Sequence, residues 1–383
     1  MNRKSLEPRK YQICSECVMD TSDSKITFDE NGRCDFCQDY HNNILKRWDP
    51  NSVDKEALNK MAKEIKKRSK GAKYDCIIGF SGGIDSSYCL YVAKVLMGLN
   101  PLAYICDTGW NTEFANNNIK TILEKLNIDS YVEKVNWEEM KDLQVAFLKS
   151  QVPYQDLPQD LAIFAGLYNY AAKHNIKCTL TGANLATESI RPPLEWVYMN
   201  DTKMIADIHK KYGTIKLKTF PWCNIFKYRV IYRVFKGIKR YAPLDLMDYD
   251  KTRVEEFLIN QFGWHNYSNK HYEDIFTRWY EGYYLPTKFG FDKRRCYYSN
   301  LIHLGEMTRD EALKLLSKPG YSLEEAEKDT EYIAKKLGLD ISEFKTIIKG
   351  ENKTYKDYKN SYNLMKFFIA IARFFGIAKW KYR

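Results

Sequence analysis

Residues 74–87 read YDCIIGFSGGIDSS, an apolar run that passes directly into a glycine pair and then into a helical pattern. The apolar run 74–80 predicts a short buried strand, and the helical period from Ser86 to Met97 predicts the helix that follows it. Between them, two glycines let the backbone approach a ligand closely, and the helix N-terminus adds partial positive charge. This order of strand, loop and helix predicts a site for a phosphate-like anion at the carboxyl end of a parallel strand.

The same alternation of apolar runs and helical periods continues to about residue 190. The predicted strands are 74–80, 101–106, 130–135 and 177–181, and the predicted helices are 53–70, 86–97, 111–126, 137–150 and 160–174. Because parallel neighbours need a crossover helix, this pattern indicates an α/β fold with a doubly wound parallel sheet. The rest of the chain is predicted to be mainly helical, with N-terminal capping signals at Thr308, Ser322 and Asp340.

The glycine loop is neither a Walker A loop nor a G-x-G-x-x-G fingerprint, since it lacks the closing lysine of the first and the spacing of the second. It resembles the pyrophosphate-binding loop of the PP-loop ATP pyrophosphatases, whose fold is adenine-nucleotide hydrolase-like. The alternative is an ordinary strand-to-helix turn that Asp85 caps. The resemblance implies that ATP binds here, with Mg²⁺ held in part by Asp85, and that the pyrophosphate is held by Ser81, Gly82, Gly83, Ser86 and Ser87.

A second loop, Thr181–Glu188 (TGANLATE), follows the fourth predicted strand. In a doubly wound sheet it lies beside the first loop, across the nucleotide crevice. We expect Gly182 to permit close backbone approach and Glu188 to contact Mg²⁺ or the substrate. The alternative for Glu188 is an exposed position on a strand-to-helix turn.

Four of the ten cysteines form two Cys-x2-Cys pairs with sixteen residues between them, namely Cys14 with Cys17 and Cys34 with Cys37. This spacing is typical of a structural zinc site made of two knuckles, and zinc would fold a segment too short to have its own core. An iron–sulfur cluster and disulfides are the alternatives. The other six cysteines are scattered, as expected in a reducing compartment.

A cluster of three cations, Lys293-Arg294-Arg295, lies between aromatic residues and glycines. A solvated surface patch is one interpretation of such a cluster. A folded anion site is the other, and it makes Lys293 and Arg294 candidate catalytic residues for the phosphates or an anionic substrate.

Several segments together resemble the bacterial N-acetyl sugar amidotransferases of surface polysaccharide and O-antigen (lipopolysaccharide) biosynthesis. They are the cysteine unit running into Val18-Met-Asp-Thr-Ser22, the Ser-Gly-Gly-Ile-Asp-Ser-Ser loop, Arg191-Pro-Pro193 and Phe291-Asp-Lys-Arg294. The resemblance implies a ligase that adenylates the acetamido oxygen of an N-acetylated sugar, with a nucleotide-linked uronic acid as the expected substrate. Ammonia then displaces AMP and leaves an acetamidine.

The source of ammonia is expected to be a separate glutaminase partner. The residue after Met1 is Asn2 rather than a nucleophilic cysteine, and no Cys-His-Glu glutaminase domain is recognisable. In the resembled family, ammonia comes from subunits similar to the glutaminase and cyclase of the histidine pathway. We therefore expect ammonium salts, but not glutamine, to support turnover by this chain alone.

Length and composition set the remaining expectations. The 383 residues are 44% apolar and carry a net charge of +11, which favours anionic partners such as nucleotides, sugar nucleotides, nucleic acid or an acidic membrane. No apolar stretch is long enough to span a bilayer and no secretory signal is evident, so we expect a soluble, cytoplasmic protein. We divide it into a zinc unit (1–45), an ATP-binding α/β domain (46–215) and a mainly helical region (216–383).

Two rival functions remain. The main alternative is a PP-loop enzyme of tRNA thiolation, which shares the first half-reaction but usually needs a catalytic cysteine near the nucleotide. A non-enzymatic nucleic-acid-binding protein is the other, suggested by the segment 216–241 with eight cations and no acid. We expect no nucleic-acid partner, because neither alternative explains the remaining motifs as well.

The C-terminal stretch 361–383 has apolar residues at helical spacings and only positive charge. One hypothesis is a helix docked on the protein body or on a partner subunit. The other is a basic amphipathic helix that lies on an anionic membrane surface.

Overall fold

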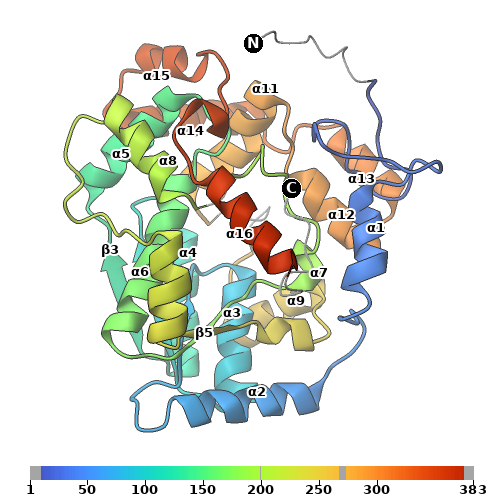
Figure 1. Cartoon of the computed structure of the whole chain (residues 1–383), viewed down its shortest axis with the longest axis vertical. Coiled ribbons are helices and arrows are strands. Elements are labelled where there is room, and N and C mark those ends of the chain that lie inside the picture. The colour runs from blue at the N-terminus through green and yellow to red at the C-terminus, as the bar shows by residue number, and fades with distance from the viewer. Residues whose placement is uncertain (1–9, 199, 267–272, 375–383) are drawn as a thin grey trace.

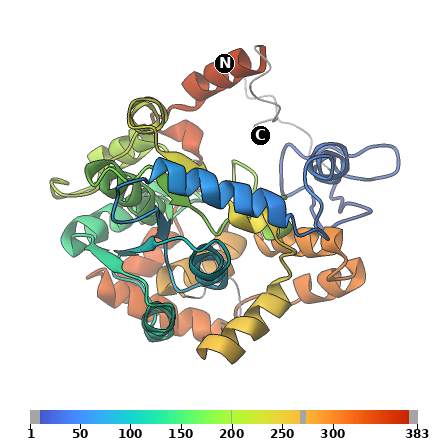
Figure 2. The same cartoon turned by 90° about the horizontal axis from the view of Figure 1, so that it is seen from below.

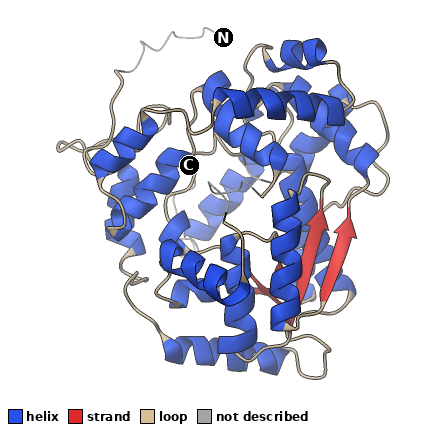
Figure 3. Ribbon diagram, turned by 180° about the vertical axis from the view of Figure 1, so that it is seen from behind, coloured by secondary structure: helices blue, strands red, loops and turns tan. Residues whose placement is uncertain are grey.

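The computed structural model describes residues 10–198, 200–266 and 273–374, without the side chains of 372–374. Its centre is one sheet of five parallel strands in the order β3-β2-β1-β4-β5. The strands are β1 (Cys76–Gly79), β2 (Pro101–Asp107), β3 (Ser130–Lys134), β4 (Cys178–Leu180) and β5 (Lys239–Tyr241). Figure 3 shows strands running side by side with helices packed around them. The predicted α/β fold with a parallel sheet is confirmed.

The strands bury both of their faces, because alternate side chains point to opposite sides. Ile77 of β1 and Leu102 of β2 belong to one apolar core, whereas Ile78 and Ala103, the next residues along, belong to the other. Two separate cores on one sheet are the signature of a doubly wound arrangement.

Helices cover each face of the sheet. On one side lie α2 (Lys55–Arg68), α3 (Ile84–Tyr91) with its continuation η2 (Val92–Leu96), α4 (Glu113–Leu126) and α9 (Lys251–Phe262). On the other side lie α5 (Trp137–Ser150), α6 (Leu157–Lys173), α8 (Thr202–Tyr212) and η3 (Lys227–Phe235). The first four strands and the five helices predicted before residue 190 all appear at or close to the predicted positions.

The fifth strand was not predicted. β5 pairs in parallel with β4 inside the basic segment 216–241, and its burial is limited to Tyr241. It lies beyond residue 215, so the sheet extends past the predicted end of the α/β domain. The domain limits themselves remain a prediction.

The C-terminal region is helical, as predicted. After the short loop helices α7 (Leu185–Glu188) and η4 (Pro243–Leu246) come α10 (Ile275–Trp279), η5 (Tyr280–Tyr284), α11 (Leu285–Phe289), α12 (Arg294–Leu304), α13 (Arg309–Leu316), α14 (Leu323–Lys336), α15 (Ile341–Ile348), η6 (Tyr355–Asp357) and α16 (Tyr362–Phe374). Thr308 and Ser322 form complete capping boxes, and Asp340 caps α15 by accepting from the Ser342 N–H.

The last helix, α16, is not buried against the rest of the chain. The exposed fractions of Leu364, Phe367 and Phe368 are 52%, 61% and 56%. These three side chains therefore have little contact with the rest of the chain, although Met365 and Ile369 of the same helix are half-buried. Docking on the body or a partner subunit and binding to a membrane surface both remain predictions for this stretch. The side chains of 372–374 and all of 375–383 lie outside the part of this stretch that the structure describes.

The N-terminal cysteine unit, with α1 (Asp35–Asp39) and η1 (Tyr40–Ile44), packs on α12 and α13 at the edge of the molecule (Figure 1). Arg295 pairs with Asp20 at 3.0 Å and donates to the Val18 carbonyl at 2.8 Å. Arg309 donates to the Cys14 carbonyl at 2.8 Å. The cysteines thus pack against the C-terminal region and Trp196, whereas Tyr40 and Ile44 of η1 belong to the apolar core on one face of the sheet.

None of the helices in the described part of the chain combines the length and apolar character that crossing a bilayer requires.

Candidate active site

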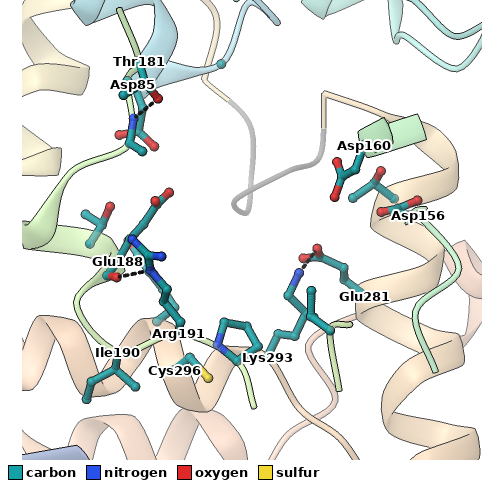
Figure 4. Close-up of a pocket in the computed structure, with 18 of the residues that line it drawn as sticks. Asp85, Asp156, Asp160, Thr181, Glu188, Ile190, Arg191, Glu281, Lys293 and Cys296 are labelled. Carbon is teal, nitrogen blue, oxygen red and sulfur yellow. Dashed lines mark hydrogen bonds and ion pairs between the residues drawn. The ribbon is translucent and has the colours of Figure 1, made fainter. Parts of the chain in front are cut away.

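A cavity of 2900 Å³ opens at the carboxyl ends of the strands, where β1 and β4 are neighbours. The loop after β1, the loop after β4 and residues of the C-terminal helices all line it (Figure 4). The strand order reverses between β1 and β4, and doubly wound sheets bind ligands at such a switch point. The cavity is therefore the candidate active site.

The glycine loop enters this cavity at the start of α3. Gly82 has a φ of +81°, and a Cβ there would lie 2.8 Å from the Ala115 carbonyl oxygen, so conformation and space both require glycine. The Ser81 hydroxyl accepts from the Gly83 N–H at 3.3 Å, and the Ser86 hydroxyl donates to the Gly83 carbonyl at 3.1 Å. The first N–H groups of α3 have no partner inside the helix, which leaves them to bind an anion.

The predicted members of this loop do not all lie in the cavity. Ser81, Gly83, Asp85 and Ser86 line it. Gly82 instead packs against α4, and Trp264 donates to its carbonyl at 2.9 Å. Ser87 is fully buried and does not line the cavity, because it points to the core side of α3. Contact between these two residues and pyrophosphate finds no support in the structure.

The loop after β4 touches the glycine loop directly. A Cβ at Gly182 would lie 2.7 Å from the Asp85 carbonyl atoms and 2.9 Å from the Ser86 nitrogen. Only glycine permits this approach. The structure thus places Gly182 where the sequence predicted it, across the crevice from the first loop.

Two donors that sequence reasoning missed hold the Asp85 side chain. The Tyr249 hydroxyl donates to Asp85 Oδ1, and Asn184 Nδ2 approaches the same oxygen at 3.4 Å. Burial, together with the charge of Asp85, raises the pKa of Tyr249 well above its ordinary value, so the phenol remains a donor. The carboxylate is fixed in orientation at the start of α3.

Glu188 and Arg191 lie on the same side of the cavity as Asp85 (Figure 4). Their loop is held by Asn300 of α12, which is 1% exposed. Asn300 Nδ2 donates to the carbonyls of Thr187 and Ile190 at 3.0 and 3.1 Å, and its Oδ1 accepts from the Ile190 N–H at 2.8 Å. Glu188 is half-buried in the cavity wall, which differs from the exposed turn position that was its alternative.

The opposite wall is rich in carboxylates. Asp156, Asp160 and Glu281 surround Lys293, and Lys293 pairs with Glu281 (Figure 4). Asp160 is accessible from the cavity, and desolvation at this enclosed position raises its pKa to about 6. Burial also lowers the pKa of Lys293, but Glu281 and the two aspartates raise it overall. The lysine is therefore a fixed cation within an acidic wall.

Glu273 joins the two walls. A Cβ at Gly83 would lie 2.9 Å from Glu273 Oε1, so this carboxylate lies against the glycine loop. Burial, with smaller contributions from Asp274, Asp85 and Glu281, raises the pKa of Glu273 to about 7. A carboxyl group that titrates near neutrality can exchange protons during a reaction.

The three adjacent cations have three different positions. Lys293 faces the acidic wall, Arg294 pairs with Asp292 at 2.7 Å in the cavity lining, and Arg295 pairs with Asp20 of the cysteine unit. Their side chains are only 21%, 24% and 15% exposed, so the interpretation as a solvated patch is wrong. Each cation already has a carboxylate partner.

The four predicted metal ligands converge in the N-terminal unit. Cys14, Cys17, Cys34 and Cys37 are buried free thiols, and their sulfurs all lie within 4.8 Å of one another. Three of the Sγ–Sγ distances are 3.6 to 3.7 Å. Tetrahedral zinc with Zn–S bonds of about 2.3 Å requires edges of about 3.8 Å, whereas a disulfide requires about 2.05 Å. The donor set fits a single metal ion and not disulfides.

The residues that sequence reasoning missed share one property. Tyr249, Glu273 and Asn300 each act on a loop far away in the sequence, and none belongs to a local motif. Of the three, only Asn300 could have been suspected from the sequence, because it follows the cation cluster 293–295 by five residues.

Residues 273–371 match the family described as "LPS biosynthesis protein WbpG-like, C-terminal domain". This segment runs from α10 into α16 and contributes the acidic wall residue Glu281, Lys293 and Asn300 to the site. Over this segment, the match confirms the resemblance to surface-polysaccharide biosynthesis proteins that the sequence motifs predicted.

A relative in sequence is the uncharacterized protein MJ1599 of Methanocaldococcus jannaschii, which is 31% identical over 122 residues. The matched part is 30% of this chain, and the chain spans 40% of that protein's length.

Among solved structures, the chain is similar to NMN synthetase from Francisella tularensis, with a TM-score of 0.32 and 16% identity over 74% of this chain and 94% of that one. It is also similar to an NH3-dependent NAD synthetase from Campylobacter jejuni, with a TM-score of 0.32 and 14% identity over 75% and 98% of the two chains.

Proposed function

We propose that this chain is an ATP-dependent sugar amidotransferase of lipopolysaccharide biosynthesis that acts in the cytoplasm, because residues 273–371 match the WbpG-like C-terminal domain of LPS biosynthesis proteins. One observation carries the proposal. A single cavity is lined both by the glycine loop at the start of α3 and by Lys293, Arg294 and Asn300 of the matched segment. An anion-binding loop and a polysaccharide-family segment thus form one site.

In the first half-reaction the loop binds the β- and γ-phosphates of ATP. The N–H groups at the start of α3, with the Ser81 and Ser86 hydroxyls, stabilise pyrophosphate as the leaving group. The acetamido oxygen of the sugar attacks the α-phosphorus, the bond from that phosphorus to the bridging oxygen breaks, and an adenylated intermediate forms. Activation is needed because an amide oxygen is otherwise a very poor leaving group.

The residues at the loop fit a divalent cation. Asp85 is held in a fixed orientation by two donors, and Glu188 lines the same side of the cavity. Carboxylate oxygens are the ligands that Mg²⁺ prefers. Bound there, Mg²⁺ would neutralise part of the phosphate charge.

In the second half-reaction ammonia attacks the activated carbon, AMP departs with the former acetamido oxygen, and the nitrogen loses protons. Asp160, with a pKa of about 6, and Glu273, with a pKa of about 7, are placed to accept a proton at neutral pH. We assign proton transfer to the acidic wall for this reason.

The substrate is an N-acetylated sugar, with a nucleotide-linked uronic acid as the first choice. Arg191 is exposed at the cavity and donates to the Glu188 carbonyl at 3.4 Å. Its guanidinium suits a carboxylate or a diphosphate. Lys293 and Arg294 remain catalytic candidates, although their ion pairs with Glu281 and Asp292 must be shared with, or yield to, the substrate.

We propose that ammonia reaches this cavity from separate glutaminase and cyclase-like subunits. Structural zinc in the four-cysteine site completes the proposal, with the role of holding the N-terminal unit against α12 and α13.

The thiolation alternative is weaker, because it requires a reactive cysteine beside the nucleotide. Cys106 and Cys296 line the cavity. Burial raises the pKa of Cys106 to about 12 and raises that of Cys296 further, so neither thiol is ionised at neutral pH.

The test is pyrophosphate release by the purified chain with ATP, a panel of N-acetylated nucleotide sugars, and either ammonium chloride or glutamine. We expect release of AMP and pyrophosphate with one sugar and ammonium, and no turnover with glutamine. Turnover that depends on tRNA would favour thiolation, and efficient use of glutamine by the chain alone would refute the partner subunits.

A further inference from the structure

Two helical segments present large apolar side chains to solvent on one face of the molecule. The first is η3 together with residues 225 and 226, which directly precede it, and the second is α16. Both lie toward the viewer in Figure 1, and both project at the upper edge of Figure 2. Residues of both also line the candidate active-site cavity, so they flank its opening. We call this surface the η3–α16 face.

The apolar residues of this face are bulky and mostly more than half exposed. On the η3 side the exposed fractions are 61% for Phe226, 69% for Val234 and 76% for Phe235. On α16 they are 52% for Leu364, 61% for Phe367, 56% for Phe368 and 39% for Ile371. Apolar surface gathered in this way marks a binding surface, whereas single exposed apolar residues do not.

The inward side of η3 explains why its apolar residues point outward. Tyr232 is buried and donates to Asn169 at 2.6 Å, and Tyr228 packs edge-on against Phe164 and Tyr168 of α6. The helix is therefore anchored to the body through tyrosines. Its phenylalanines and Val234 have no such role in the fold.

The charge of the same face has a single sign. In the described part of the chain its cations include Arg229 and Arg233 of η3, Lys236 directly after η3, and Lys366 of α16, and neither helix contains an acidic residue. Within the described part of the chain, no carboxylate lies within ion-pair distance of Arg229, Arg233, Lys236 or Lys366. Elsewhere in this structure, exposed cations such as Lys73 and Lys328 do pair with acids.

We propose that the η3–α16 face binds the surface of a bilayer that contains anionic phospholipid. Exposed phenylalanines beside unpaired cations are what an interfacial helix presents to lipid, because the rings enter the acyl boundary while the cations meet the head groups. Two such helices on one face act together. A protein partner would leave these cations unmatched unless its own surface were strongly acidic.

The orientation that follows has a consequence for access to the site. Phe226 and Phe368 belong to the proposed membrane face and also line the cavity. Binding would therefore turn the cavity opening toward the bilayer. This proposal goes beyond the proposed reaction and does not depend on it, since its readout is binding to vesicles.

The experiment is sedimentation of the full chain with phosphatidylcholine vesicles, prepared with or without phosphatidylglycerol. We expect binding only to the anionic vesicles. This binding should weaken as added salt shortens the Debye length, which is about 10 Å at 0.1 M salt and shorter at higher concentrations. Arg233→Gln/Lys236→Gln should lose about 25-fold in affinity, at about fivefold for each cation. Phe235→Ser and Phe367→Ser should each lose about tenfold.

Matched controls separate location from composition. Lys60→Gln/Lys63→Gln removes the same charge from exposed positions on α2, and Phe114→Ser removes a ring as exposed as Phe367, at 61%, from α4 on the other side of the sheet. Both controls should bind as the wild type does. Failure of the full chain to bind anionic vesicles at low salt, or equal losses in the controls, would overturn the proposal. The proposal would also be overturned if the full chain never binds vesicles and the variants of the η3–α16 face instead lose binding to a protein partner.

Discussion

Replacement of Gly182 by alanine should move the loop after β4 away from the start of α3. The new Cβ would lie 2.7 Å from the Asp85 carbonyl atoms, and both segments are backbone, so neither can rotate away. Ordinary contact begins at 3.4 Å, so the two loops must separate by about 0.7 Å. This displacement falls between the segments that are proposed to hold ATP.

The size of the effect follows from that displacement. A misplacement of about 1 Å in a catalytic site costs on the order of 100-fold in rate, so about 0.7 Å predicts a loss of about 30-fold, or about 2 kcal/mol. The crowding should also lower the free energy of unfolding by about 1–3 kcal/mol. We therefore expect a folded protein whose rate of AMP formation is about 30-fold lower than that of the wild type.

The rate of AMP formation at saturating substrate, together with thermal denaturation, measures both effects. The control is Gly263→Ala, which has open space around it but a φ of +65° and lies at the end of α9. It should lose about 1–2 kcal/mol of stability through strain and keep its rate of AMP formation. The reasoning is refuted if Gly182→Ala forms AMP within about threefold of the wild-type rate, or if both variants lose activity alike.

Three further predictions test other parts of the site. Asp85→Asn should lower AMP formation by more than about 100-fold, whereas Tyr249→Phe, which removes only one donor to the carboxylate, should lower it about tenfold; equal activities would contradict the assigned roles. Cys14→Ser should release a single zinc ion and expose the N-terminal unit to protease, and metal analysis that finds iron instead would exclude zinc. Burial raises the pKa of Glu273 from 4.5 to about 7, so the stability that its protonated form contributes is present below about pH 4.5 and lost as the pH rises through about 7. Glu273→Gln should therefore have a higher Tm than wild type at about pH 8 and no such advantage at about pH 4.5, and a gap that does not change with pH would contradict the buried charge.

The sheet could be predicted because its signal is local. The apolar runs of β1 and β2 are buried on both faces, and α5 begins and ends at the predicted residues, Trp137 and Ser150. β5 lacks that signal. Its residues Lys239 and Arg240 are exposed, and its strand character comes from pairing with β4.

Site residues could be predicted where the backbone conformation requires a particular residue type. They could not be predicted where side chains distant in the sequence contact one another. Gly82 and Gly182 are required by close approach, which a glycine-rich loop already indicates. The three cations 293–295 looked alike in sequence, but successive positions at the start of α12 point in different directions, about 100° apart. Their separate partners Glu281, Asp292 and Asp20 could not be found without the fold.

The most direct measurement of the central claim follows an oxygen atom. The substrate sugar is prepared with a heavy oxygen isotope in its acetamido group and turned over with ATP and ammonium, and the products are analysed by mass spectrometry. If the acetamido oxygen attacks the α-phosphorus, the label appears in AMP, the pyrophosphate is unlabelled, and the sugar has exchanged oxygen for an NH group. Label in inorganic phosphate with formation of ADP, or label retained in the sugar, would contradict adenylation at this loop.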